Sequence, residues 1–143
     1  MSRKLTIAVG AFLLAPVLSA QTLQPPFAGV YVYTDLGSVP GVPTYYGGVV
    51  FKAGNPNKML LGGNANGAAG AIYEIDVVRD SQGFITGFSG TATMVSTAPY
   101  IDGGLCYGPG GVLFCTTYNN NNLLQIKPGS SVPDKVIPLG GLV

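Results

Sequence analysis

The sequence predicts an all-β protein assembled from short antiparallel strands. Glycine and proline contribute 22 and 11 of the 143 residues, and both residue types interrupt helices. Short apolar runs separated by Gly-, Pro- and Asn-rich turns recur along residues 47–139, as expected for strands joined by tight turns. Residues 47–102 and 103–139 repeat the same order of runs and turns. We therefore expect two antiparallel four-stranded meanders.

The composition is that of a folded protein with few charges. Hydrophobic residues make up 47% of the chain, including 8 Tyr and 6 Phe, so a core can form and disorder is not expected. Charged residues make up only 9%, against roughly 25% in an average soluble domain. The formal charge is +1, and basic residues form no long run. Binding to nucleic acid or to an anionic membrane surface is therefore not expected.

The N-terminal segment, residues 1–20, has the pattern of a secretory signal peptide. The basic residues Arg3 and Lys4 precede an apolar stretch at residues 5–18, and small residues end the segment at Ala20. The alternative is a membrane anchor, but the apolar stretch is shorter than the roughly 20 residues that span a bilayer. We expect export to the periplasm or the extracellular space, and no membrane attachment after cleavage.

Residues 21–46 are predicted to form a leading strand and a linker. Residues 28–34 (AGVYVYT) alternate small, aromatic and β-branched side chains, which favours a strand. Residues 35–44 (DLGSVPGVPT) contain many turn-forming residues and no periodic pattern.

The first predicted repeat, residues 47–102, contains four strands. They are expected at residues 47–51 (GGVVF), 58–63 (KMLLGG), 71–77 (AIYEIDV) and 84–95 (FITGFSGTATMV). The turns AGNPN and NANGAAG separate the first three runs, and Gly, Pro and Asn suit such turns because they accept or fix unusual φ angles.

The second predicted repeat, residues 103–139, follows the same order. Its strands are expected at residues 103–107 (GGLCY), 112–118 (VLFCTTY), 123–129 (LLQIKPG) and 135–139 (KVIPL), and residues 140–143 (GGLV) resemble the start of a third repeat. The starts at 47, 103 and 140 are spaced by 56 and 37 residues. These spacings bracket the roughly 40–50 residues of a four-stranded repeat unit. The alternative is a β-sandwich in which the Gly-Gly starts coincide by chance.

The two cysteines allow two interpretations. In an oxidising compartment Cys106 and Cys115 could form a disulfide, because they lie on neighbouring predicted strands and face each other if the loop between those strands has an even number of residues. The alternative is a pair of small, buried, free thiols. A redox centre is not expected because there is no CxxC motif, and two cysteines cannot hold zinc alone.

The absence of histidine restricts catalysis. A Ser-His-Asp triad, a Cys-His dyad and any histidine-ligated metal site are excluded for this chain. Glu74 and Asp76 are two residues apart in a predicted strand, so both acids lie on one face. They form either a solvated face or a paired-carboxylate site. We expect no catalytic constellation in this chain.

The segment GGLCYGPGGVLFCTTYNNNNLLQIKPG resembles a blade of secreted β-propellers of the NHL-repeat and gluconolactonase-like type. The matching features are Asp102 before a Gly-led strand, the Pro-Gly turn at 109–111, the Asn turn at 119–122 and the Lys-Pro-Gly turn at 127–129. The resemblance covers roughly residues 47–143. It implies a disc of blades around a channel, with ligands at one mouth.

The chain departs from that pattern in two ways. It holds two complete copies, whereas propellers have about 4–8 blades, so we expect an N-terminal fragment of a longer protein or an incomplete propeller. It also lacks the histidines that quinoprotein sugar dehydrogenases of similar shape use as a base, which argues against sugar oxidation.

Asp102, Asn119 and Asn120 are the predicted ligand-binding residues, because the resemblance implies that an acid before the first strand of a blade lies near the channel mouth. The Asn run could offer carbonyl oxygens to calcium or simply form a turn; no other cofactor is expected. Tyr31, Tyr33, Tyr45 and Tyr46 offer an aromatic platform for a sugar or pack against strands.

The sequence therefore predicts a secreted binding or structural module without chemistry of its own. The alternative is a fragment of a hydrolase or lactonase-like enzyme that needs acids and a metal from further blades. The expected partners are a carbohydrate or protein ligand, and either further blades of a longer chain or other copies of this one.

Overall fold

The computed structural model describes residues 22–141, which form two units divided between Thr34 and Asp35. Among these residues, no helix is long and apolar enough to cross a membrane. The predicted signal peptide and the last two residues of the predicted third repeat lie outside the described part of the chain.

The first unit, as described over residues 22–34, contains one short element, the 3-10 helix η1 (Phe27–Gly29). The rings of Phe27 and Tyr31 lie 6.1 Å apart, inclined by 55°. The leading strand predicted over residues 28–34 is wrong, because η1 occupies its start and the remainder has no strand. An alternating sequence forms a strand only beside a partner that satisfies its backbone, and no described strand pairs with this segment.

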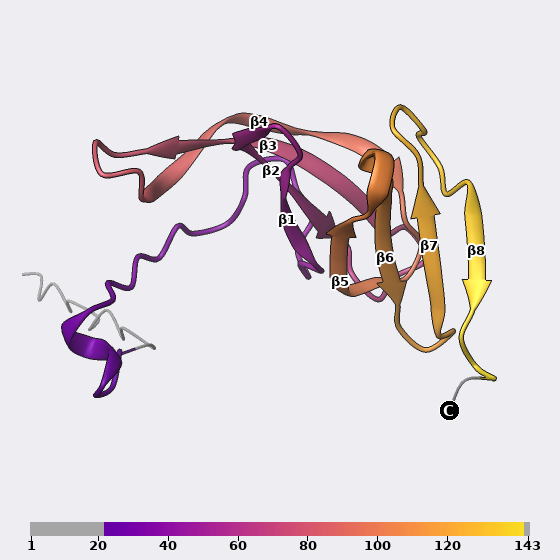
Figure 1. Cartoon of the computed structure of the whole chain (residues 1–143), viewed down its shortest axis with the longest axis horizontal. Coiled ribbons are helices and arrows are strands. Elements are labelled where there is room, and N and C mark those ends of the chain that lie inside the picture. Colours follow the sequence, from indigo (N-terminus) through magenta and orange to yellow (C-terminus); the bar gives the residue numbers. More distant parts are fainter. Residues whose placement is uncertain (1–21, 142–143) are drawn as a thin grey trace, which may run out of the picture. The chain divides into compact units, whose positions relative to one another are not determined.

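The second unit is all-β, as predicted, and contains two four-stranded antiparallel sheets (Figure 1). The first sheet has the order β1 (Val49–Lys52), β2 (Asn55–Gly63), β3 (Ala71–Arg79) and β4 (Ile85–Thr97). The second has the order β5 (Ile101–Tyr107), β6 (Leu113–Thr117), β7 (Asn122–Ile126) and β8 (Lys135–Pro138). The 3-10 turn η2 (Pro109–Gly111) joins β5 to β6. Each sheet is a meander in which every strand pairs with the next along the chain.

Several predicted strand ends move by a few residues; β7, for example, ends at Ile126 rather than at residue 129. Two further corrections change how the sheets are joined. β2 begins at Asn55 rather than at residue 58, because only two residues are needed to turn the chain after Lys52. β5 begins at Ile101, so the predicted boundary between residues 102 and 103 falls inside a strand. The two sheets are instead separated by the short link at residues 98–100.

The main core lies in the seam between the two sheets. Leu60 and Ile72 from the first sheet pack against Leu113, Cys115 and further apolar residues of the second. Ile72 is fully buried and Cys115 is 1% exposed. Burying apolar surface from both sheets in a single cluster is the main stabilising contribution to this arrangement.

The linker covers the outer face of the first sheet. Val39 and Val42 are buried against Leu61 and Ile75, which point away from the seam. The N–H of Val39 donates a 2.8 Å hydrogen bond to the hydroxyl oxygen of Tyr46. The segment predicted as an unpatterned linker therefore forms a small second core.

Corresponding side chains point into the seam in the first sheet and away from the seam in the second sheet. When the two Gly-Gly pairs are aligned, Val50 corresponds to Cys106 and Leu60 corresponds to Phe114. Val50 and Leu60 face the seam. Cys106 and Phe114 lie on the outer face of the second sheet, because the residues next to them along each strand are in the core. The sheets therefore stack front to back.

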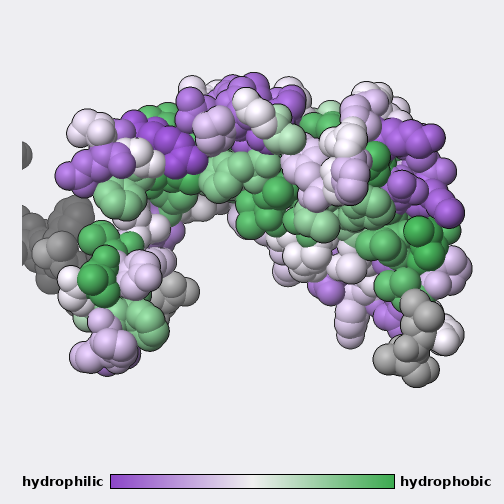
Figure 2. All heavy atoms as spheres, in the orientation of Figure 1, coloured by the Kyte–Doolittle hydropathy of each residue, from purple (hydrophilic) through white to green (hydrophobic). Residues whose placement is uncertain are grey.

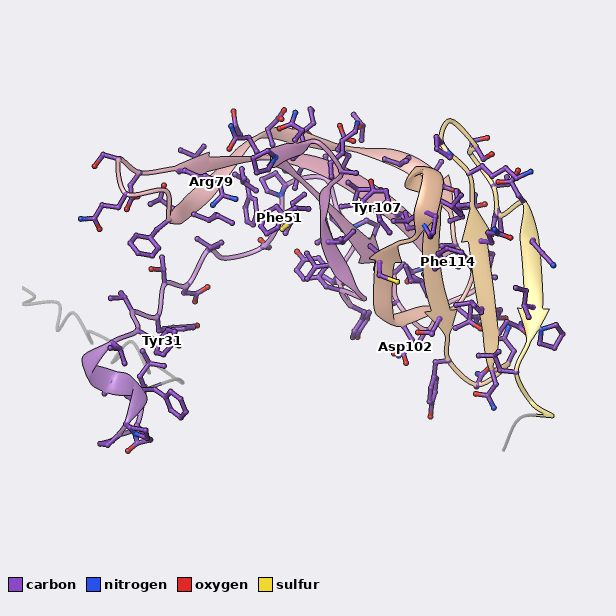
Figure 3. All side chains as sticks on the ribbon, viewed as in Figure 1. Tyr31, Phe51, Arg79, Asp102, Tyr107 and Phe114 are labelled. Carbon is purple, nitrogen blue, oxygen red and sulfur yellow. The ribbon has the colours of Figure 1, made fainter. Side chains whose placement is uncertain are left out.

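Arg79 closes the β3–β4 hairpin. Its guanidinium donates hydrogen bonds to the carbonyl oxygens of Gly83, at 2.7 Å, and Pro56, at 2.9 Å. The guanidinium carbon also lies 5.3 Å from the ring centroid of Phe51 (Figure 3), in the range of a cation–π interaction. Arg79 thus serves the fold, since its guanidinium contacts two carbonyl oxygens and one aromatic ring.

Candidate functional site

The connections at one end of the two sheets form a continuous surface, which we call the loop end. It comprises Tyr45, residues 64–70, 98–100 and 118–121, and Leu139. Main-chain hydrogen bonds of 2.7–2.9 Å join these segments, from Ala65 to Tyr45, from Tyr100 to Gly67, from Tyr118 to Tyr100 and from Leu139 to Asn121. The loops of both sheets are thereby held as one structure.

The backbone of the loop end contains an unusual number of left-handed residues. Among the described residues, six non-glycine residues have φ between 45° and 65°, and every one of them belongs to this surface: Tyr45, Asn64, Asn66, Tyr100, Asn119 and Asn121. Asparagine tolerates this left-handed conformation, but for a bulky tyrosine it is unusual. Such residues cost about 1–3 kcal/mol each and concentrate at functional sites.

A pocket of about 460 Å³ opens at the loop end. Its walls are Asp102, Thr116, Thr117, Tyr118, Asn121, Asn122 and Leu139. The hydroxyl oxygen of Thr116 accepts a hydrogen bond from the N–H of Gly104, and that of Thr117 accepts one from the N–H of Asn122. The Thr116 hydroxyl keeps its own O–H as a donor. The carboxylate, the phenol and the two amides are further groups that can bond a ligand.

Two exposed tyrosine rings lie at the loop end, and one of them, Tyr118, lines this pocket. Tyr118 is 57% exposed and Tyr45 is 78% exposed. Of the other tyrosines considered in the sequence, Tyr46 bonds the linker, and Tyr31 and Tyr33 belong to the first unit. Sequence reasoning missed Tyr118 because it placed this residue at the end of a predicted strand, whereas β6 ends at Thr117 and Tyr118 begins the loop.

The three predicted ligand-binding residues all lie at or beside the loop end, but not in one cavity. Asp102 lies near the start of β5 (Figure 3), half-buried in the wall of the 460 Å³ pocket. Asn120 lines a neighbouring pocket of about 330 Å³ together with Tyr100 and Pro133. Asn119 is exposed and lines neither.

The Asn run forms the turn between β6 and β7. Asn119 and Asn121 have φ of 57° and 45°, and the carbonyl oxygen of Asn121 accepts a hydrogen bond from the N–H of Leu139. In the described part of the chain, no group of three or more His, Cys, Asp or Glu side chains converges as a metal site would require.

The two thiols are free and occupy opposite faces of the second sheet. Cys106 is paired with Phe114, and Cys115 with Leu105. The loop between Tyr107 and Leu113 holds five residues, an odd number, so the register that would bring the two cysteines face to face does not form. The structure has free thiols, but only Cys115 is buried, and Cys106 is exposed. Burial and then the neighbouring Cys106 raise the pKa of Cys115 to about 12.

Glu74 and Asp76 belong to an ion-paired cluster with Lys52 of β1 and Lys58 of β2. Asp76 is exposed, as expected for a solvated face, whereas Glu74 is half-buried. Lys52 Nζ lies 2.6 Å from one carboxylate oxygen of Glu74, and Lys58 Nζ lies 3.1 Å from the other. Lys58 also contacts Asp76 at 3.0 Å. Partial burial raises the pKa of Glu74, but the hydrogen bonds from both lysines outweigh it and hold that pKa below its ordinary value of 4.5.

Figure 2 shows one face of the second unit. In the view of Figure 2, hydrophilic residues follow the upper border and apolar residues lie below them over the strands.

Comparison of the chain with protein-family models, curated proteins and solved structures finds no match.

Proposed function

We propose that this chain is a secreted binding module of the β-propeller type, and that its loop end binds a carbohydrate. The observation that carries the proposal is the concentration of strained, polar and aromatic residues at one end of two stacked meanders. Backbone strain is retained where surrounding structure and function require it.

Three features support a propeller-type arrangement of the sheets. The link of three residues at 98–100 joins the outer strand of the first sheet to the first strand of the second. β1 and β5 lie side by side, each leading its own meander (Figure 1). Front-to-back stacking, in which equivalent faces point the same way, suits a repeating array, whereas a two-fold symmetric sandwich brings equivalent faces together.

The chemistry of the pocket favours a ligand rich in hydroxyl groups. Six of its seven lining residues carry a polar group and only Leu139 is aliphatic. Asp102 offers acceptors, the amides of Asn121 and Asn122 offer both donors and acceptors, and the ring of Tyr118 offers an apolar face. This set pairs with the hydroxyls and the C–H face of a sugar ring.

A glycan microarray followed by calorimetric titration of the best binder tests the proposal. Tyr118→Ala and Asp102→Asn should each weaken binding by about tenfold or more, as expected for central contacts. Tyr31→Ala is the matched control, because that tyrosine is equally exposed but lies in the first unit. Equal loss in all three variants, or no glycan bound, would refute a carbohydrate site at the loop end.

A further inference from the structure

A second concavity lies in the seam between the two sheets, away from the loop end. This seam pocket has a volume of about 290 Å³. Tyr107 lines it at the opposite end of β5 from Asp102 (Figure 3). It shares no lining residue with the two pockets at the loop end, so it is independent of the proposed carbohydrate site.

The floor of the seam pocket is apolar and firmly held. Leu60, Leu113 and Ile126 line it, and each is at most 5% exposed within the core between the sheets. Because these side chains are packed from behind, the floor is a preformed surface for an alkyl or aryl group.

The rim of the seam pocket carries hydrogen-bond donors that the fold leaves unused. Both carboxylate oxygens of Glu74 are engaged, by Lys52 and by Lys58. Lys52 uses one donor in that contact, and an ammonium has three. Lys127 is 65% exposed, and its Nζ lies 3.9 Å from the carboxylate of Asp134, which is too far for a hydrogen bond. The carboxylate on the rim is thus paired with lysines, while two ammonium groups retain free donors.

We propose that the seam pocket binds a small amphipathic anion, with an alkyl or aryl body on the floor and a carboxylate or sulfonate head held by Lys52 and Lys127. A cation would meet a carboxylate that is already neutralised by two lysines. A neutral molecule would leave the lysine donors unpaired by the ligand. The volume lies near the lower end of the roughly 300–1,000 Å³ of small-molecule pockets, which sets the size class of the ligand.

Three unbranched probes with ten carbon atoms each and different head groups separate these cases. Decanoate, 1-decanol and decylamine are titrated into the full-length protein and followed by calorimetry. Decanoate should bind about tenfold more tightly than either other probe, the factor expected for a charge-assisted hydrogen bond, and raised salt should weaken only its binding. Equal affinity for decanoate and decanol, tighter binding of decylamine, or no binding of decanoate at about 1 mM would overturn the proposal.

Two pairs of variants locate the site. Val95→Asp places a negative charge in the pocket wall and should abolish decanoate binding, whereas Met94→Asp alters the adjacent exposed residue outside the pocket and should not. Lys127→Gln should weaken decanoate about fivefold or more without affecting decanol, and Lys135→Gln is its control on β8. All four positions are at least a third exposed, so folding is retained. If the two variants of either pair changed decanoate binding equally, the probe would be bound outside the seam pocket.

Discussion

The main-chain N–H of Gly48 donates a 2.7 Å hydrogen bond to the carbonyl oxygen of Asp102 and so joins the first sheet to the second. The approach is close because Gly48 has no side chain. A Cβ there would lie 2.7 Å from both the carbonyl oxygen of Gly103 and the Cβ of Leu105. The first Gly-Gly pair is therefore explained by this contact, in which the chain just before β1 lies against β5. Each of these strands begins one of the two meanders.

Gly48→Ala should destabilise the protein by about 1–3 kcal/mol, because the added methyl group clashes with backbone that cannot move away. Gly103→Ala is the matched control, since a Cβ at that position meets no atom within 4 Å; it should change stability by less than about 0.5 kcal/mol. Urea unfolding of both variants measures the difference. Equal stability of the two would show that the sheets are not held at this contact.

The thiols should differ in reactivity. Cys106 is exposed and Cys115 is buried with a pKa raised to about 12, and only thiolate reacts rapidly. At about pH 8 a disulfide reagent that reports free thiols should modify one cysteine per folded chain and two after denaturation. Cys106→Ser should remove the native reaction and Cys115→Ser should preserve it. Absence of reactive thiol in the unreduced, denatured protein would mean that a disulfide forms.

Acid should remove the stabilisation that Glu74 contributes. Its folded pKa is lowered below 4.5, so its contribution is complete above the unfolded pKa and is lost as the pH falls through the folded value. Glu74→Gln should be about 1 kcal/mol less stable than the parent protein at about pH 7 and equally stable at about pH 2. Lys135→Gln serves as the control. A stability gap for Glu74→Gln that is constant with pH would contradict the ion-paired cluster.

The linker should act as a cap on the first sheet. Val42 is 8% exposed and covers the outer face of that sheet, so Val42→Asp should cost about 2–4 kcal/mol and expose an apolar sheet face. Light scattering after size-exclusion chromatography should then detect more self-association than in the parent protein. Val132→Asp, at an exposed position, should leave both properties unchanged. A monomeric and stable Val42→Asp variant would show that the linker is dispensable.

Export is predicted from the N-terminal segment alone. N-terminal sequencing of exported protein should begin at Gln21 or within a few residues of it. Leu13→Arg should block export by breaking the apolar stretch. Recovery of the intact chain, starting at Met1, from the cytoplasm of cells carrying the parent sequence would contradict a cleaved signal peptide.

The sequence by itself predicted the strands because alternating apolar runs and Gly-, Pro- and Asn-rich turns are local signals. All eight strands of the second unit overlap predicted runs, and both sheets have the expected order. The same local alternation misled at residues 28–34, since a strand exists only beside another strand. Likewise, the facing of Cys106 and Cys115 depended on whether the loop between them contains an odd or even number of residues, which composition does not reveal.

Only the tertiary structure decided which residues form sites. Asp102 could be selected from its place before a Gly-led strand, but its neighbours in the pocket come from three other segments of the chain. Lys52, Glu74 and Lys127 belong to three strand or turn segments of two sheets, so no spacing in the sequence relates them. Sites of this kind arise where sheets stack, and stacking depends on the sum of apolar burial across the seam rather than on any local pattern.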